Sequence, residues 1–315
     1  VLSAEMAFSS PEARADRVSA LNFLMTANAG IVVVPVAGLR KYLPTKETWQ
    51  NAQLHWEIGT EVEPEILAQR LVLMGYERQS MVGKPGEFSI RGSIIDVYPL
   101  NAEYPVRVEL FDVEIDSIRY FEADTQRSLE NLEEVTISPM TDLVFSKSDM
   151  NHGMMRLQDA LEKRLATAKD QTETDFLEEY FGQLLSSWEQ GIPTENAHYY
   201  TDFLYQQKTT LLDYLPENSL LFVDDYSRMM ETEREIAREE AEWQTLKIEE
   251  MRVFSEQTFG VDFHDQLRKT ARNTTFFSLF QKGMGNLRFQ EVHNFQYRSM
   301  QQFFGQMPLL KAEVD

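Results

Sequence analysis

Residues 86–99 read GEFSIRGSIIDVYP, and residues 105–121 read PVRVELFDVEIDSIRYF. Apolar and polar residues alternate along both stretches, and glycine and proline residues interrupt them. Because successive side chains of a strand point to opposite faces of a sheet, the alternation predicts half-buried strands over 88–98, 106–111 and 115–121. This part of the chain is therefore expected to form an antiparallel sheet.

The same unit extends toward the N-terminus through a strand and a helix. Residues 54–58 alternate as a strand, and Pro64 and Gly75 bound a segment whose apolar residues fall on one face of a helix. One helix and a set of antiparallel strands predict a small α+β domain over residues 52–138.

Residues 1–51 have a different pattern. Ser10-Pro11-Glu12 is a helix start, and the run Ile31–Val34 is continuously apolar and of strand length. A run of this kind is typical of a strand covered on both faces, as in a parallel α/β sheet. Residues 1–51 are therefore interpreted as a partial α/β domain. Because the chain opens on Val1 and ends without a helix stop signal, we expect it to be a fragment.

The chain turns helical beyond residue 139. Residues 150–190 carry apolar residues at helical spacing among many charges, and residues 226–250 form a long run of mixed charge. Leu220–Val223 is a second run typical of a buried strand, and Thr274–Phe280 is a further candidate strand. We expect residues 139–294 to form a helical and α/β part, and residues 295–315 to begin a further domain.

Composition excludes several functions. The chain of 315 residues has 51 acidic and 30 basic residues, a net charge of −21, which disfavours binding to nucleic-acid phosphates. It has no cysteine, and its five histidines lie far apart in the sequence, so we expect no metal site. It has neither a long apolar run nor a signal peptide, which predicts a cytoplasmic protein without a membrane partner.

No catalytic motif is found. A P-loop requires Gly-x-x-x-x-Gly-Lys-Ser/Thr, but Pro85 follows Gly83-Lys84, and Arg78 occupies the position of the first glycine. Asp224 and Asp225 follow the apolar run at Leu220 as Walker-B acids would, but without a P-loop the favoured interpretation is two solvated acids that end a strand and start a helix. There is no Gly-x-Ser-x-Gly elbow. We therefore expect no catalytic residue and no cofactor site in this chain.

Residues 106–111 are the best candidate for a binding surface. If Val106 and its alternate residues face the core, then Arg107 and Phe111 point to the opposite face. Arginine and aromatic residues are enriched at interaction hot spots, and Arg91 lies on the polar face of the neighbouring run. An alternative is a sheet covered on both faces, in which Phe111 is buried against a second layer.

The stretches 86–99, 106–112 and 114–119 resemble the N-terminal region of bacterial transcription-repair coupling factors, which is similar to the UvrB repair protein. Residues 124–128 and 211–216 match the same region. The resemblance implies a degenerate helicase-type (RecA-like) α/β domain, a small α+β second domain and a helical third part.

The resemblance also implies a function. The family recruits UvrA through its second domain, with two arginines and a phenylalanine that correspond to Arg91, Arg107 and Phe111. It implies no enzyme activity in this chain, with ATP and magnesium bound only by the motor of the parent DNA translocase. It further implies that the remainder of the parent masks the surface, and that this part binds little or no DNA. The alternatives are a structural, autoinhibitory domain and a DNA-binding helicase-like fragment.

Overall fold

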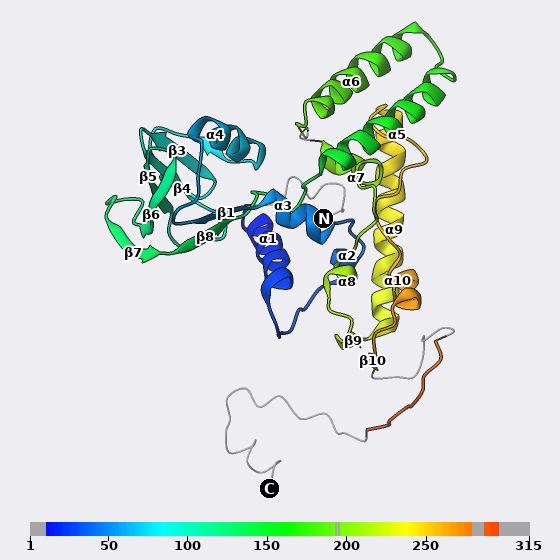
Figure 1. The fold of residues 1–315 in the computed structure, drawn as a ribbon. Helices are drawn as coiled ribbons and strands as arrows, with labels where there is room; N and C mark the ends of the chain where they lie inside the picture. The colour runs from blue at the N-terminus through cyan, green and yellow to red at the C-terminus, as the bar shows by residue number, and fades with distance from the viewer. Residues whose placement is uncertain (1–10, 193, 195, 279–286, 296–315) are drawn as a thin grey trace, which may run out of the picture.

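The computed structural model describes residues 11–192, 194, 196–278 and 287–295. It is a mixed α/β protein, as predicted. Figure 1 shows a sheet domain on one side and a group of helices on the other, joined where β1 (Leu54–Glu57) and β8 (Glu134–Ile137) run side by side. Apart from its first residue, the expected unit 295–315 lies outside the described residues.

The main sheet of the small domain has six strands in the order β2-β3-β4-β5-β6-β7. Its pairs are antiparallel except for β2–β3. One helix, α4 (Pro64–Leu73), packs on its apolar face, as predicted. The strands are β2 (Glu77–Arg78), β3 (Glu87–Arg91), β4 (Ile94–Val97), β5 (Val106–Phe111), β6 (Glu114–Phe121) and β7 (Ser128–Leu132).

The alternation of apolar and polar residues correctly predicts which strand residues form the core of this domain. Val97, Val106 and Val108 are each 1 % exposed or less, and they pack with Leu67 and Leu71 of α4. The predicted run 88–98, however, is two strands. Gly92, at φ 63°, turns the chain between β3 and β4, a conformation that only glycine adopts without a steric penalty.

The prediction of a buried strand at Ile31–Val34 is wrong. The segment has no strand hydrogen bonding, and the exposed fractions of Ile31 and Val33 are 90 % and 92 %. A strand needs a partner for its backbone N–H and C=O groups. No strand among the described residues pairs with this segment, so only Val34 joins the core cluster around Val36.

Two strands lie at the far end of the helical part. β9 (Leu221–Asp224) and β10 (Thr274–Phe277) pair in parallel, and Val223 is buried. The prediction that the whole run at Leu220 is buried is wrong, because Leu220 and Phe222 are each 62 % exposed. Four further helices lie between this end and the small domain in Figure 1: α1 (Pro11–Thr26), α2 (Val36–Leu39), α3 (Lys46–Ala52) and α8 (Leu211–Tyr214).

Aromatic side chains fill the core of the helical part. Trp188 and Phe181 pack around Tyr200, and Phe254 contacts Phe181 with ring centroids 4.8 Å apart. The predicted helices over 150–190 and 226–250 are confirmed. The helices are α5 (Lys147–Leu165), α6 (Gln171–Glu189), α7 (Thr201–Leu204), α9 (Tyr226–Glu249) and α10 (Phe263–Lys269).

Candidate protein-interaction surface

The polar face of the six-stranded sheet carries the three predicted binding residues. Arg107 of β5 lies directly opposite Asp96 of β4. Arg91 of β3 lies opposite Ile94, which is two residues before Asp96 in β4 and therefore on the same face of the sheet. Phe111 ends β5, two residues along the same face from Glu109. The register therefore brings the two arginines together around one carboxylate and places the phenylalanine at the end of the strand.

The Asp96 carboxylate organises the arginines. Asp96 is fully buried, and its Oδ1 and Oδ2 accept hydrogen bonds from Nε and Nη2 of Arg107 at 2.6 and 2.8 Å. Nη2 of Arg91 donates to the same Oδ2 at 2.6 Å. A charge-assisted pair with two parallel hydrogen bonds fixes both the position and the plane of a guanidinium. Asp96 therefore holds Arg107 rigidly and Arg91 by one bond.

Arg107 is a buried residue. It is 9 % exposed, its Nη2 also donates to Gln126 Oε1 at 2.7 Å, and its guanidinium lies 4.2 Å from the ring centre of Phe121. Hydrogen bonding to Asp96 raises the pKa of Arg107 above its ordinary value, against the effect of burial. Two nitrogens of this side chain are therefore used inside the domain, whereas the side chain of Arg91 remains 40 % exposed.

Phe111 is a highly exposed aromatic residue at the end of β5. Its exposed fraction is 78 %, and that of the neighbouring Val113 is 37 %. The tight turn between β5 and β6 begins at Asp112, which has a φ of 59°. The ring of Phe111 therefore lies at the tip of the β5–β6 hairpin. The alternative in which Phe111 is buried against a second layer is wrong.

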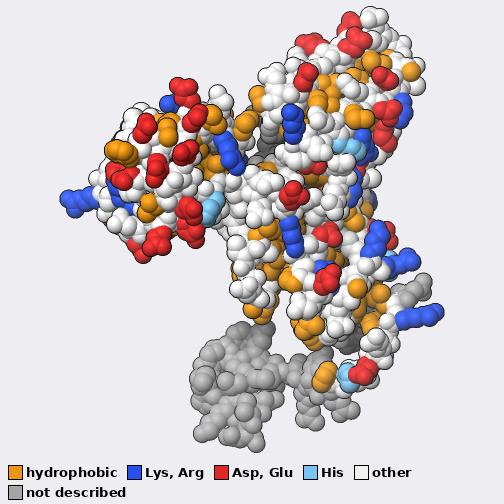
Figure 2. All heavy atoms as spheres, viewed as in Figure 1, with side chains coloured by type: hydrophobic (Ala, Val, Ile, Leu, Met, Phe, Trp, Pro, Cys, Tyr) orange, Lys and Arg blue, Asp and Glu red, His pale blue; other side chains and the backbone are white. Residues whose placement is uncertain are grey.

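An ion pair lies beside the arginines. Arg119 of β6 donates to Glu109 of β5, and this hydrogen bond lowers the pKa of the Glu109 carboxyl. Figure 2 shows acidic side chains over much of the visible face of the small domain, in keeping with the net charge. The surface therefore combines an apolar ring, one accessible arginine and the Glu109–Arg119 ion pair.

The residues considered for nucleotide binding have other partners. The backbone amides of Gly83 and Lys84 donate to Glu87 Oε2 at 2.8 and 3.1 Å, so this loop encloses a carboxylate of the chain itself. Asp225 is the N-cap of α9 and accepts from the amide of Arg228. Gly83, Lys84 and Asp225 therefore already make hydrogen bonds within the chain.

Sequence reasoning missed Asp96. A single acid in the apolar strand Ile94–Val97 is a usable signal, because it must either face water or find a cation.

The structure describes no helix with both the length and the apolar character needed to cross a bilayer.

Comparison with known proteins identifies the domain. Residues 54–143, which begin at the first residue of β1, match the family model of the UvrB interaction domain. The sheet domain and its candidate surface thus belong to a UvrB interaction domain.

The comparison extends along the whole chain. The chain is 38 % identical to the transcription-repair coupling factor of Bacillus subtilis, over 100 % of the chain and 27 % of that protein. It is 34 % identical to that of Staphylococcus haemolyticus and 32 % identical to that of Staphylococcus aureus, over 99 % of the chain and 26 % of each relative. The chain belongs to the transcription-repair coupling factor family, and it spans about a quarter of the length of these relatives.

Proposed function

We propose that this chain is a non-catalytic module that recruits UvrA, and that it thereby links a stalled RNA polymerase to nucleotide excision repair. The observation that carries the proposal is the 78 % exposed ring of Phe111 on the same sheet face as an ordered arginine pair, in a domain that matches the UvrB interaction domain. Aromatic residues and arginine are both enriched at interaction hot spots.

Each residue has a distinct part in the proposed complex. Phe111 inserts into an apolar pocket of UvrA, and Arg91 donates its remaining N–H groups to a carboxylate of UvrA. Arg107 acts from behind the surface: it holds Asp96, and Asp96 holds Arg91. Arg107 is thus a positioning residue, which modifies the expectation that both arginines bind the partner directly.

The longer protein supplies what this module lacks. In the proposed scheme the parent is an ATP-dependent DNA translocase in the cytoplasm, and its motor binds ATP and magnesium. The remainder of the parent covers the docking surface until the motor has engaged the polymerase. The absence of a P-loop from the sequence and the net charge of −21 both support a module that neither hydrolyses ATP nor binds DNA strongly.

We also propose that residues 1–51 form part of a degenerate helicase-type (RecA-like) α/β domain, and that residues 139–294 are the helical and α/β part that completes the UvrB-like module. The parallel pairing of β9 with β10, which are connected through α9 and α10, supports this relationship, because parallel strands joined by helices are the unit of α/β folds.

Isothermal titration calorimetry of the chain with UvrA, and separately with a DNA duplex, tests the proposed function. We expect saturable binding to UvrA, weakened by added salt, and no saturable binding to the duplex. Binding to DNA alone would favour the helicase-like alternative. Binding to neither would favour the structural, autoinhibitory alternative.

A further inference from the structure

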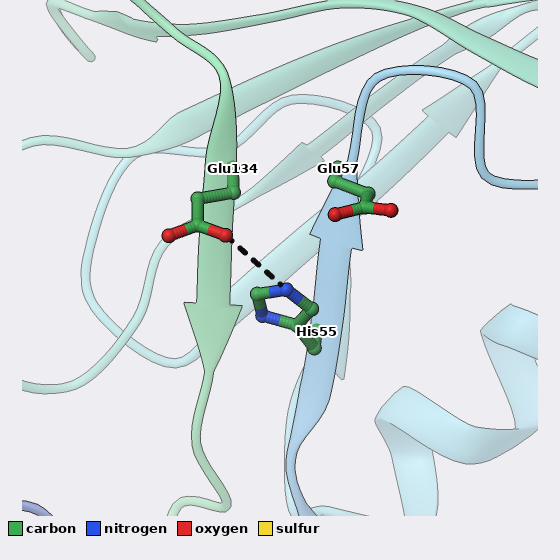
Figure 3. Close-up of side chains that lie close together, drawn as sticks. All are labelled: His55, Glu57 and Glu134. Carbon is green, nitrogen blue, oxygen red and sulfur yellow. Dashed lines mark ion pairs between the residues drawn. The ribbon is translucent and has the colours of Figure 1, made fainter. Parts of the chain in front are cut away.

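A histidine and two glutamates meet on the small β1–β8 sheet, and none of them is one of the proposed docking residues Arg91, Arg107 and Phe111. They are His55, Glu57 and Glu134, all exposed, and one potential ligand atom from each lies within 4.8 Å of the others. Figure 3 shows the imidazole between the two carboxylate-bearing side chains, with Nε2 of His55 3.4 Å from Oε2 of Glu134. Among the described residues, these are the one group of three histidine or acidic side chains whose potential ligand atoms lie this close together.

The fold creates this cluster from residues far apart in the sequence. His55 and Glu57 are alternate residues of β1 and therefore share a face of the sheet. Glu134 of β8 is the antiparallel partner of Glu57 and lies diagonally across from His55. The separation between β1 and β8 explains why the spacing of histidines along the chain predicts no metal site.

The histidine ring has a partner on its other side. Nδ1 of His55 lies 3.2 Å from Oγ1 of Thr136, its cross-strand neighbour, and Nε2 faces Glu134. Histidines that bind metals are usually held by a hydrogen bond at the nitrogen that does not coordinate, which fixes the tautomer and the orientation of the ring. The contact with Thr136 supplies this support.

The charges favour a cation at this position. Glu57 and Glu134 are direct cross-strand partners, and like charges in that position destabilise a sheet. Within the described part of the chain, the His55 imidazole is the one basic side chain within salt-bridge distance of either carboxylate. A bound divalent cation would remove the repulsion in a chain whose net charge is −21.

We propose that His55, Glu57 and Glu134 bind a divalent transition-metal ion of the zinc class. One imidazole nitrogen and two carboxylate oxygens are ligands that zinc accepts, at about 2.0–2.2 Å, with water in the remaining position. All three side chains are exposed, so they can close to these distances by changing rotamer. The ion would connect β1, through which the chain enters the small domain, to β8, through which it leaves (Figure 1).

Zinc titration of the 315-residue chain tests the site. Excess Mg²⁺ in the buffer occupies isolated surface carboxylates but competes poorly for imidazole. We expect binding of one Zn²⁺ per chain, and a rise in the thermal unfolding temperature with added zinc. His55→Ala and Glu134→Gln should each weaken binding by about tenfold or more and remove the thermal shift.

His293→Ala is the matched control, because His293 forms an exposed pair with Glu291 at 3.1 Å that has no third ligand in the described part of the chain. It should bind zinc as the wild type does. The proposal is overturned if the wild-type chain does not bind one zinc ion, or if folded His55→Ala binds it equally well. Neither result bears on UvrA binding, since the zinc titration contains no UvrA.

Discussion

Asp96 and Arg107 form a two-bond ion pair inside the small domain, with N–O distances of 2.6 and 2.8 Å, and the carboxylate has no exposed surface. This pair joins neighbouring strands and also receives Arg91 from a third strand. It therefore links the stability of the sheet to the geometry of the proposed docking surface.

Asp96→Asn is expected to lower the free energy of unfolding by about 3–5 kcal/mol, because it leaves the Arg107 guanidinium buried without its counter-charge. Urea denaturation measures the effect. Asp116→Asn, on an exposed position of β6, is the control and should change stability by less than about 0.5 kcal/mol. Equal stabilities for the two variants would show that the pair does not stabilise the fold.

A buried cluster of one arginine and two glutamates connects the C-terminal end of α2 to α9. Arg40 donates to Glu233 at 3.0 Å and to Glu240 at 2.6 Å, and all three residues are buried. Arg40→Ala should destabilise the chain by about 3–5 kcal/mol, since two carboxylates lose their cation. Arg238→Ala is the matched variant, because Arg238 pairs with Glu242 on the solvent side of α9, and it should cost less than about 1 kcal/mol. Similar denaturation midpoints for both variants would contradict this account.

The stability that the Glu109–Arg119 ion pair contributes to the fold depends on pH. The hydrogen bond from Arg119 lowers the pKa of Glu109 in the folded chain below its ordinary value of 4.5. The pair therefore stabilises the fold above that value, and its contribution is lost as pH falls through the lowered pKa. An NMR titration of the Glu109 carboxyl should give a midpoint below 4.5 in the wild type and a higher one in Arg119→Gln. The same midpoint in both proteins would rule out Arg119 as the cause.

The sequence is most informative where local pattern determines structure. Alternation along 105–121 predicts β5 and β6 and places Val106 and Val108 in the core. The alternation cannot predict that the Arg107 side chain is buried, because its burial depends on Asp96 in the neighbouring strand and on Gln126 and Phe121 beyond β5.

Long-range pairing explains the remaining differences. The apolar run at Ile31–Val34 predicts a strand, but a strand forms only beside a partner, and the described residues provide none. The His55–Glu134 contact likewise depends on β1 pairing with β8, which no spacing within either strand reveals. Residues 86–99 predict the sheet and Arg91, but not that Asp96 connects the two arginines.

Calorimetric titration of UvrA into wild-type chain, Phe111→Ala and Ile66→Ala tests the central claim most directly. Phe111 and Ile66 are 78 % and 60 % exposed, so both variants should fold with stabilities within about 0.5 kcal/mol of the wild type. We predict that Phe111→Ala loses at least about 2 kcal/mol of binding free energy, a weakening of roughly thirtyfold, while Ile66→Ala on α4 binds normally. Wild-type affinity in a folded Phe111→Ala variant would contradict the assignment of this surface to UvrA.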